Sequence, residues 1–115
     1  MKTLDRDKLN RLINDDFGQF LLTSLENLEG ERAFSIDETV KAHGSTREEL
    51  RERFCSVYGQ HEAMDRSFIA MEHVDSYLVN HPYVQFSPEA YRLAQLASMC
   101  LAQLYQECGK AEFES

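Results

Sequence analysis

Proline and glycine are scarce in this chain, which has two prolines and five glycines among 115 residues. Both residues interrupt regular structure, so long stretches without them favour helices. No segment shows the alternation of a strand, and no internal repeat is visible. We therefore predict an all-α fold of about five helices, orthogonal or bundle-like. It is expected to form a single domain over residues 1–115, with a frayed tail at 110–115.

Long hydrophobic runs and basic residues are also in short supply. No run of 18 apolar residues occurs, so we expect no membrane-spanning segment. The first ten residues alternate in charge and lack an apolar stretch, so we expect no signal peptide and a cytoplasmic location. The chain has 12 basic and 20 acidic residues, which gives a net charge of -8. This balance disfavours nucleic acid as a partner and favours a basic protein.

Motifs of metal binding and catalysis are missing as well. The three cysteines, Cys55, Cys100 and Cys108, lack CxxC or finger spacing, and we expect them to be free and buried. His61, Glu62, Glu72 and His73 form no pair that puts two ligands on one helix face. No Gly-rich phosphate loop or nucleophile elbow occurs. The sequence therefore predicts no metal, no cofactor and no catalytic residues, so we expect a protein that is not an enzyme.

Apolar spacing and capping residues together predict where the helices lie. The expected ranges are 5–28, 36–43, 45–58, 60–79 and 88–108, with a turn at 80–83. Gly30, Gly44 and Gly109 are the expected terminators. Ser35, the capping box Ser45-Thr46-Arg47-Glu48, and Ser87-Pro88 are the expected starts. The 60–79 helix is expected to bury Met64, Phe68, Met71, Val74, Tyr77 and Leu78.

The 88–108 helix is apolar around most of its circumference. Such a helix is either central to its domain or buries a second face in a partner subunit. A homodimer through the 88–108 helix is therefore one of the two interpretations. Ala94, Ala97 and Ala102 would let neighbouring helices approach closely in either case.

Residues 36–54 have the order of a helix-turn-helix, with a short helix, a turn at Gly44 and a capped second helix. Val40 and Ala42 would pack the first helix inward, and Leu50 and Phe54 would anchor the second. The spacing from Gly44 to Leu50 and Phe54 resembles the corresponding helices of TetR-like repressors. That resemblance implies a DNA-binding transcriptional regulator with Arg47 and Arg51 at the DNA. Three carboxylates in the same helix, those of Glu48, Glu49 and Glu52, would oppose phosphate contact.

The second half of the chain is the more acidic, since residues 54–115 hold eight acids and only Arg66, Arg92 and Lys110 as bases. Glu62, Asp65, Glu72 and Asp75 recur at spacings that align them on the exposed side of the 60–79 helix, and Tyr83 and Glu89 follow. We predict that these six residues bind a basic protein. The sharpest form of this hypothesis is an inhibitor or immunity-type protein that neutralises a basic toxin or nucleic-acid-handling enzyme. A solvated surface that keeps the protein soluble is the simpler alternative.

Overall fold

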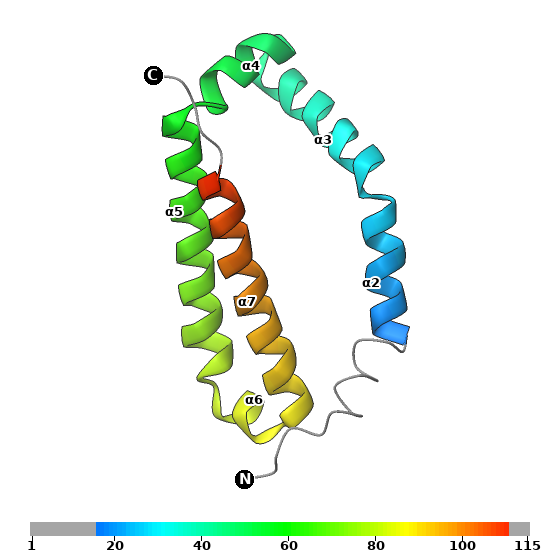
Figure 1. The fold of residues 1–115 in the computed structure, drawn as a ribbon, viewed down its shortest axis with the longest axis vertical. Helices are drawn as coiled ribbons and strands as arrows, with labels where there is room; N and C mark the ends of the chain where they lie inside the picture. The colour runs from blue at the N-terminus through cyan, green and yellow to red at the C-terminus, as the bar shows by residue number, and fades with distance from the viewer. Residues whose placement is uncertain (1–15, 111–115) are drawn as a thin grey trace. The chain divides into compact units, whose positions relative to one another are not determined.

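The computed structural model describes residues 16–110, and all regular structure in this range is helical. The all-α prediction is thus confirmed. The helices are α2 (Asp16–Glu26), α3 (Leu28–His43), α4 (Arg47–Phe54), α5 (Val57–Val74), the π-helical turn η1 (Asp75–Val79), α6 (Pro82–Phe86) and α7 (Pro88–Lys110), drawn in Figure 1. Contacts divide the chain into two units, Met1–Arg47 and Glu48–Ser115. None of the helices within residues 16–110 is both long and apolar enough to cross a membrane.

In the first unit, the break between α2 and α3 falls at Asn27 and not at Gly30 as predicted. The Asn27 side chain turns back on α2 and donates a hydrogen bond to the Thr23 carbonyl at 3.1 Å. Gly30 instead lies inside α3, where Arg32 and Glu29 form an ion pair across one turn. The polar residues after Leu28 are good helix formers, so they continue the helix. The part of the predicted 5–28 helix before residue 16 lies outside the described residues.

The end of α3 agrees with the prediction, because Gly44 terminates it in the left-handed region at φ 61°. The helix starts predicted before and after this terminator, at Ser35 and at Ser45, are both wrong. Ser35 lies inside α3, where its carbonyl accepts a hydrogen bond from Thr39 Oγ1 at 2.8 Å. The expected capping box fails because α4 begins at Arg47, which leaves Thr46 at the cap position. The buried hydroxyl of Ser45 has no hydrogen-bond partner within the part of the chain that the structure describes.

The boundary between α4 and α5 lies at residues 55–56, several residues before the predicted one. Ser56 adopts an extended conformation, and its Oγ accepts a hydrogen bond from the Gly59 amide at 3.3 Å, which caps α5. This cap places Gly59 against the end of α4. A Cβ at residue 59 would collide with the backbone carbonyl of Phe54. Glycine is therefore the residue that allows this close approach.

Helices α5 and α7 lie side by side in Figure 1 and form an antiparallel hairpin. Gln60 Nε2 donates to the Cys108 carbonyl at 2.7 Å, and at the other end Ser98 Oγ donates to Asp75 Oδ1, also at 2.7 Å. The contacting positions alternate at spacings of three and four, as in a coiled coil. By this spacing they are Gln60, Met64, Ser67, Met71 and Val74 on α5, Leu78 on η1, and Tyr91, Ala94, Ser98, Leu101, Tyr105 and Cys108 on α7. We call these positions the α5–α7 seam.

Small side chains occupy the buried positions of the seam. Among the described residues, the reported buried side chains are those of Ser67, Val79, Ala94 and Ser98. Ser67 satisfies its hydroxyl by donating to the Ala63 carbonyl at 2.7 Å. These short side chains let the two helices approach closely, which leaves little room for large residues between them.

The predicted core of the 60–79 helix is therefore only partly correct. Met64, Met71 and Val74 are half-buried on the seam, whereas Phe68, Tyr77 and Leu78 are exposed. Phe68 touches the Tyr105 ring at 6.4 Å between centroids, but it remains at the edge of the contact. The reason is geometric, because within the 48–115 unit α7 packs along only one side of α5. Ser67, which is buried, was not predicted.

The connection from α5 to α7 contains a helix that was predicted as a turn. His81 Nδ1 accepts a hydrogen bond from the Tyr83 amide at 3.1 Å, and Pro82 takes the first position of α6. Ser87 caps α7 as predicted, with its Oγ accepting from the Ala90 amide at 3.2 Å. The predicted stop at Gly109 is wrong, because α7 continues to Lys110.

Candidate partner-binding surface

One stripe of α5 faces away from the seam. Its members recur at alternating spacings of four and three residues and continue into η1: Tyr58, Glu62, Asp65, Ile69, Glu72 and Ser76. Glu62 comes two positions after the seam residue Gln60, which corresponds to a rotation of about 200° around the helix. The stripe therefore points away from α7. We call these six residues the α5 acidic face.

Two carboxylates of this face lack a counter-ion. Glu62 pairs with Arg66 one turn later, at 2.9 Å. Asp65 and Glu72 are exposed and take part in no ion pair within the described residues. Arg66 is the only lysine or arginine in α5 and η1. The face therefore has an excess of negative charge that no neighbouring cation on the same helix offsets.

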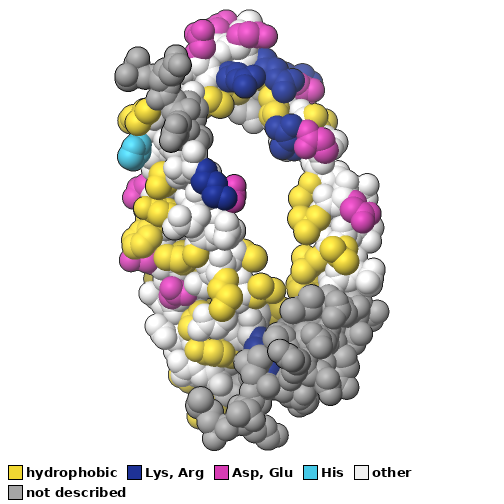
Figure 2. Space-filling model, in the orientation of Figure 1, with side chains coloured by type: hydrophobic (Ala, Val, Ile, Leu, Met, Phe, Trp, Pro, Cys, Tyr) yellow, Lys and Arg dark blue, Asp and Glu magenta, His cyan; other side chains and the backbone are white. Residues whose placement is uncertain are grey.

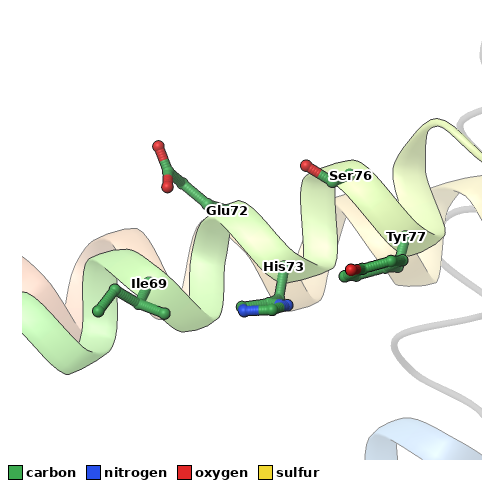
Figure 3. Close-up of a pocket in the computed structure, with 5 residues that line it drawn as sticks. All are labelled: Ile69, Glu72, His73, Ser76 and Tyr77. Carbon is green, nitrogen blue, oxygen red and sulfur yellow. The ribbon is translucent and has the colours of Figure 1, made fainter.

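Aromatic and aliphatic groups lie among these carboxylates. Ile69, Glu72, His73, Ser76 and Tyr77 line a shallow depression, and Figure 3 shows Glu72 and Ser76 on one side of it with the two rings on the other. The His73 and Tyr77 rings stack at 5.4 Å with an interplanar angle of 18°. Stacking holds Tyr77 in place although the residue is 67% exposed, and Tyr58 is 75% exposed. Exposed tyrosines beside carboxylates offer both contact area and hydrogen bonds.

The remaining residues of the predicted partner-binding set lie elsewhere. Asp75 is half-buried and accepts the Ser98 hydrogen bond of the hairpin, so it is outside the α5 acidic face. Tyr83 is exposed on α6, and Glu89 is exposed in the first turn of α7. The structure thus aligns Glu62, Asp65 and Glu72 but places the other three beyond this stripe.

The sequence analysis missed Tyr58, Ile69, His73 and Ser76 as members or neighbours of this surface. The available signal was the four-three spacing that starts at Tyr58. The predicted boundaries hide this spacing because they put Tyr58 at the end of the preceding helix, whereas α5 begins at Val57 with Ser56 as its cap.

The candidate DNA-contacting residues Arg47 and Arg51 are exposed one turn apart on α4. Glu48, Glu49 and Glu52 share this eight-residue helix. Neither α3 nor α4 contains a buried side chain, and the expected anchors Ala42 and Phe54 are exposed. The prediction that these two anchors pack inward is therefore wrong. Val40 and Leu50 are half-buried.

All three cysteines are free, as predicted, but the prediction that they are buried is wrong. Cys55 and Cys100 are exposed, and Cys108 is half-buried at the edge of the seam. Within residues 16–110, no three His, Cys, Asp or Glu side chains are grouped so that they could hold a metal ion.

Comparison with known proteins found no matching family model, no matching curated protein and no matching solved structure. The function must therefore be inferred from the surface of the chain itself.

Proposed function

We propose that this chain is a protein-binding protein that docks a basic partner on its α5 acidic face. The narrower form of the proposal is an inhibitor or immunity-type protein, which neutralises a basic toxin or nucleic-acid-handling enzyme by covering its cationic surface. The observation that carries the proposal is the stripe of α5 on which Asp65 and Glu72 flank exposed Ile69, with no counter-ion for either carboxylate among residues 16–110.

The chemistry of this stripe suits a basic protein surface in two ways. Carboxylates without a counter-ion attract lysine and arginine side chains and accelerate the encounter. Ile69 and the stacked Tyr77 supply apolar area that gains free energy when water is expelled. Because all these groups project from one helix, they keep their spacing when the partner binds.

The proposal is tested by charge reversal at the two carboxylates. The partner is first captured from nuclease-treated lysate of the source cell on tagged chain and then purified. We expect Asp65→Lys/Glu72→Lys to slow association with that partner by about tenfold or more and to flatten its dependence on salt. Stopped-flow or surface plasmon resonance measurements over a range of salt concentrations give both quantities.

The matched control is Glu31→Lys/Asp37→Lys, which makes the same charge change on exposed positions of α3. We expect it to change the association rate by less than about twofold, because these two charges belong to the 1–47 unit and not to the proposed face, so they act only through the screened net charge. Equal slowing by both double variants would mean that net charge governs association and would contradict a specific face. Unchanged kinetics for the α5 variant, or capture of no basic protein, would also contradict the proposal.

DNA binding through residues 36–54 is the competing hypothesis. It predicts that Arg47→Ala/Arg51→Ala abolishes operator binding, while the far-UV circular dichroism spectrum stays unchanged because both side chains are exposed. Electrophoretic mobility shifts with DNA recovered from the untreated capture provide the measurement. Loss of captured material on nuclease treatment would favour this hypothesis, and DNA binding retained by the double variant would remove it.

A further inference from the structure

The shallow depression on α5 and η1 has two unlike sides. The carboxylate of Glu72 and the hydroxyl of Ser76 lie on one side of it. The rings of His73 and Tyr77 lie on the other. The depression has a volume of about 230 Å³, below the roughly 300 Å³ at which pockets for small-molecule ligands begin. It therefore has room for one side chain of a partner and not for a whole ligand.

The two rings turn their faces toward this space. They are nearly parallel, with 18° between their planes and 5.4 Å between their centroids. Figure 3 shows the rings of His73 and Tyr77 close to edge-on, so one face of each ring is turned toward the side from which Glu72 projects. The face of a tyrosine ring carries partial negative charge and attracts a cation within about 6 Å of its centre. The aromatic side of the depression therefore favours a positive charge, as the carboxylate side does.

No cation of the same helix occupies this space. Glu72 takes part in no ion pair among residues 16–110. Arg66, the only lysine or arginine of α5 and η1, pairs with Glu62 instead. The carboxylate of Asp75 is engaged on the seam, where it accepts the Ser98 hydrogen bond. Figure 2 shows acidic side chains next to hydrophobic ones over α5. A cation that binds Glu72 therefore displaces no residue of this helix.

Among the cationic side chains, arginine suits both sides of the depression. Its guanidinium group is planar, so that an edge donates paired hydrogen bonds to a carboxylate and a face stacks on an aromatic ring. Its methylene stem can cover Ile69, which is 45% exposed at the same depression. A lysine ammonium is a compact and strongly hydrated charge, which can neither form the paired hydrogen bonds nor stack.

We propose that this depression binds a single arginine side chain of the basic partner, with the guanidinium group hydrogen-bonded to Glu72 and stacked on Tyr77. The inference rests on the proposed function for its partner, and it adds that the partner's cation at this point is arginine and not lysine. Asp65 lies two helical turns before Glu72, so it is left for a second basic residue of the partner.

The first test titrates the full chain with N-acetyl-arginine amide and, in parallel, with N-acetyl-lysine amide, which carries the same charge. Nuclear magnetic resonance is recorded at low salt and at pH 8, where an imidazole is ordinarily neutral. We expect the arginine probe to shift the ring signals of His73 and Tyr77 and the methyl signals of Ile69, with a dissociation constant in the millimolar range. The lysine probe is expected to bind at least about threefold more weakly. Equal binding of the two probes, no binding of either, or shifts centred elsewhere would overturn the proposal.

The second test uses variants of exposed side chains. Glu72→Gln removes the charge and Tyr77→Leu removes the ring, and we expect each to weaken binding of the arginine probe by about threefold or more. Tyr58→Leu is the matched control, because Tyr58 is 75% exposed on the same α5 acidic face but does not line the depression. We expect this control to bind the probe as the wild type does. Unchanged binding in Tyr77→Leu, or equal weakening in Tyr58→Leu, would contradict the proposed site.

The arginine site and the proposed function fail in different ways. If the two probes bind equally while Asp65→Lys/Glu72→Lys slows association with the captured partner, the docking face stands and the arginine site is wrong. If the arginine probe binds at the depression but that double variant leaves association with the partner unchanged, the arginine site stands and the docking face is wrong.

Discussion

Gly59→Ala is expected to lower the free energy of unfolding of the 48–115 unit by about 2 to 4 kcal/mol. A methyl group at residue 59 would collide with the backbone carbonyl of Phe54, and a backbone atom cannot move aside as a flexible side chain can. The end of α4 and the first turn of α5 would have to separate. That movement would also disturb the cap at Ser56, whose hydroxyl accepts a hydrogen bond from the Gly59 amide.

Urea unfolding followed by tyrosine fluorescence measures this effect selectively. All five tyrosines of the chain lie between residues 58 and 105, so their signal reports on the second unit. Gly109→Ala is the matched control in the same unit, because its methyl group would meet only the end of the flexible Met64 side chain at 3.2 Å. We expect that control to change stability by less than about 1 kcal/mol. Equal urea midpoints for the wild type and Gly59→Ala would refute the close contact between residue 59 and the Phe54 carbonyl.

Ala94→Leu is expected to destabilise the same unit by about 2 to 3 kcal/mol. Ala94 is buried on the α5–α7 seam, one turn before the buried Ser98. A leucine needs three more carbon atoms of space there and would push α7 away from α5. The Ser98–Asp75 hydrogen bond, one turn further along, would lengthen as a consequence.

Ala63→Leu is the control for this prediction, since residue 63 is exposed on α5. Its free energy of unfolding is measured in the same way, by urea titration followed by tyrosine fluorescence. We expect it to stay within about 0.5 kcal/mol of the wild-type value. If Ala94→Leu unfolds at the wild-type midpoint, the two helices do not approach closely at Ala94. Loss of stability in both variants would show instead that the size of the residue matters regardless of its position.

Several features of the fold could be predicted from local sequence chemistry. The scarcity of proline and glycine and the three-four spacing of apolar residues predicted helices throughout. Gly44 and Ser87 were correctly assigned as a terminator and a cap, because a left-handed glycine and a serine before proline act through their immediate neighbours. The alignment of Glu62, Asp65 and Glu72 on one side of α5 could also be predicted, since residues at helical spacing share a face whatever packs on the other side.

Other features depended on contacts that helical spacing does not show, some of them between residues far apart in the sequence. Nothing near Asp75 in the sequence shows that its carboxylate accepts a hydrogen bond from Ser98, 23 residues later. The start of α5 at Val57 required the contact of Gly59 with Phe54, and this shift brought Tyr58 onto the acidic face. Burial of Ser67 in place of Phe68 followed from the close approach of α7.

The sequence by itself determined that this chain is helical, acidic and apolar along its last helix, because these properties come from composition and local spacing. The tertiary structure decided which sides of α5 and α7 meet, since that choice depends on small side chains fitting between two helices. By pairing those sides, it left the acidic side of α5 and the uncharged side of α7 exposed to solvent.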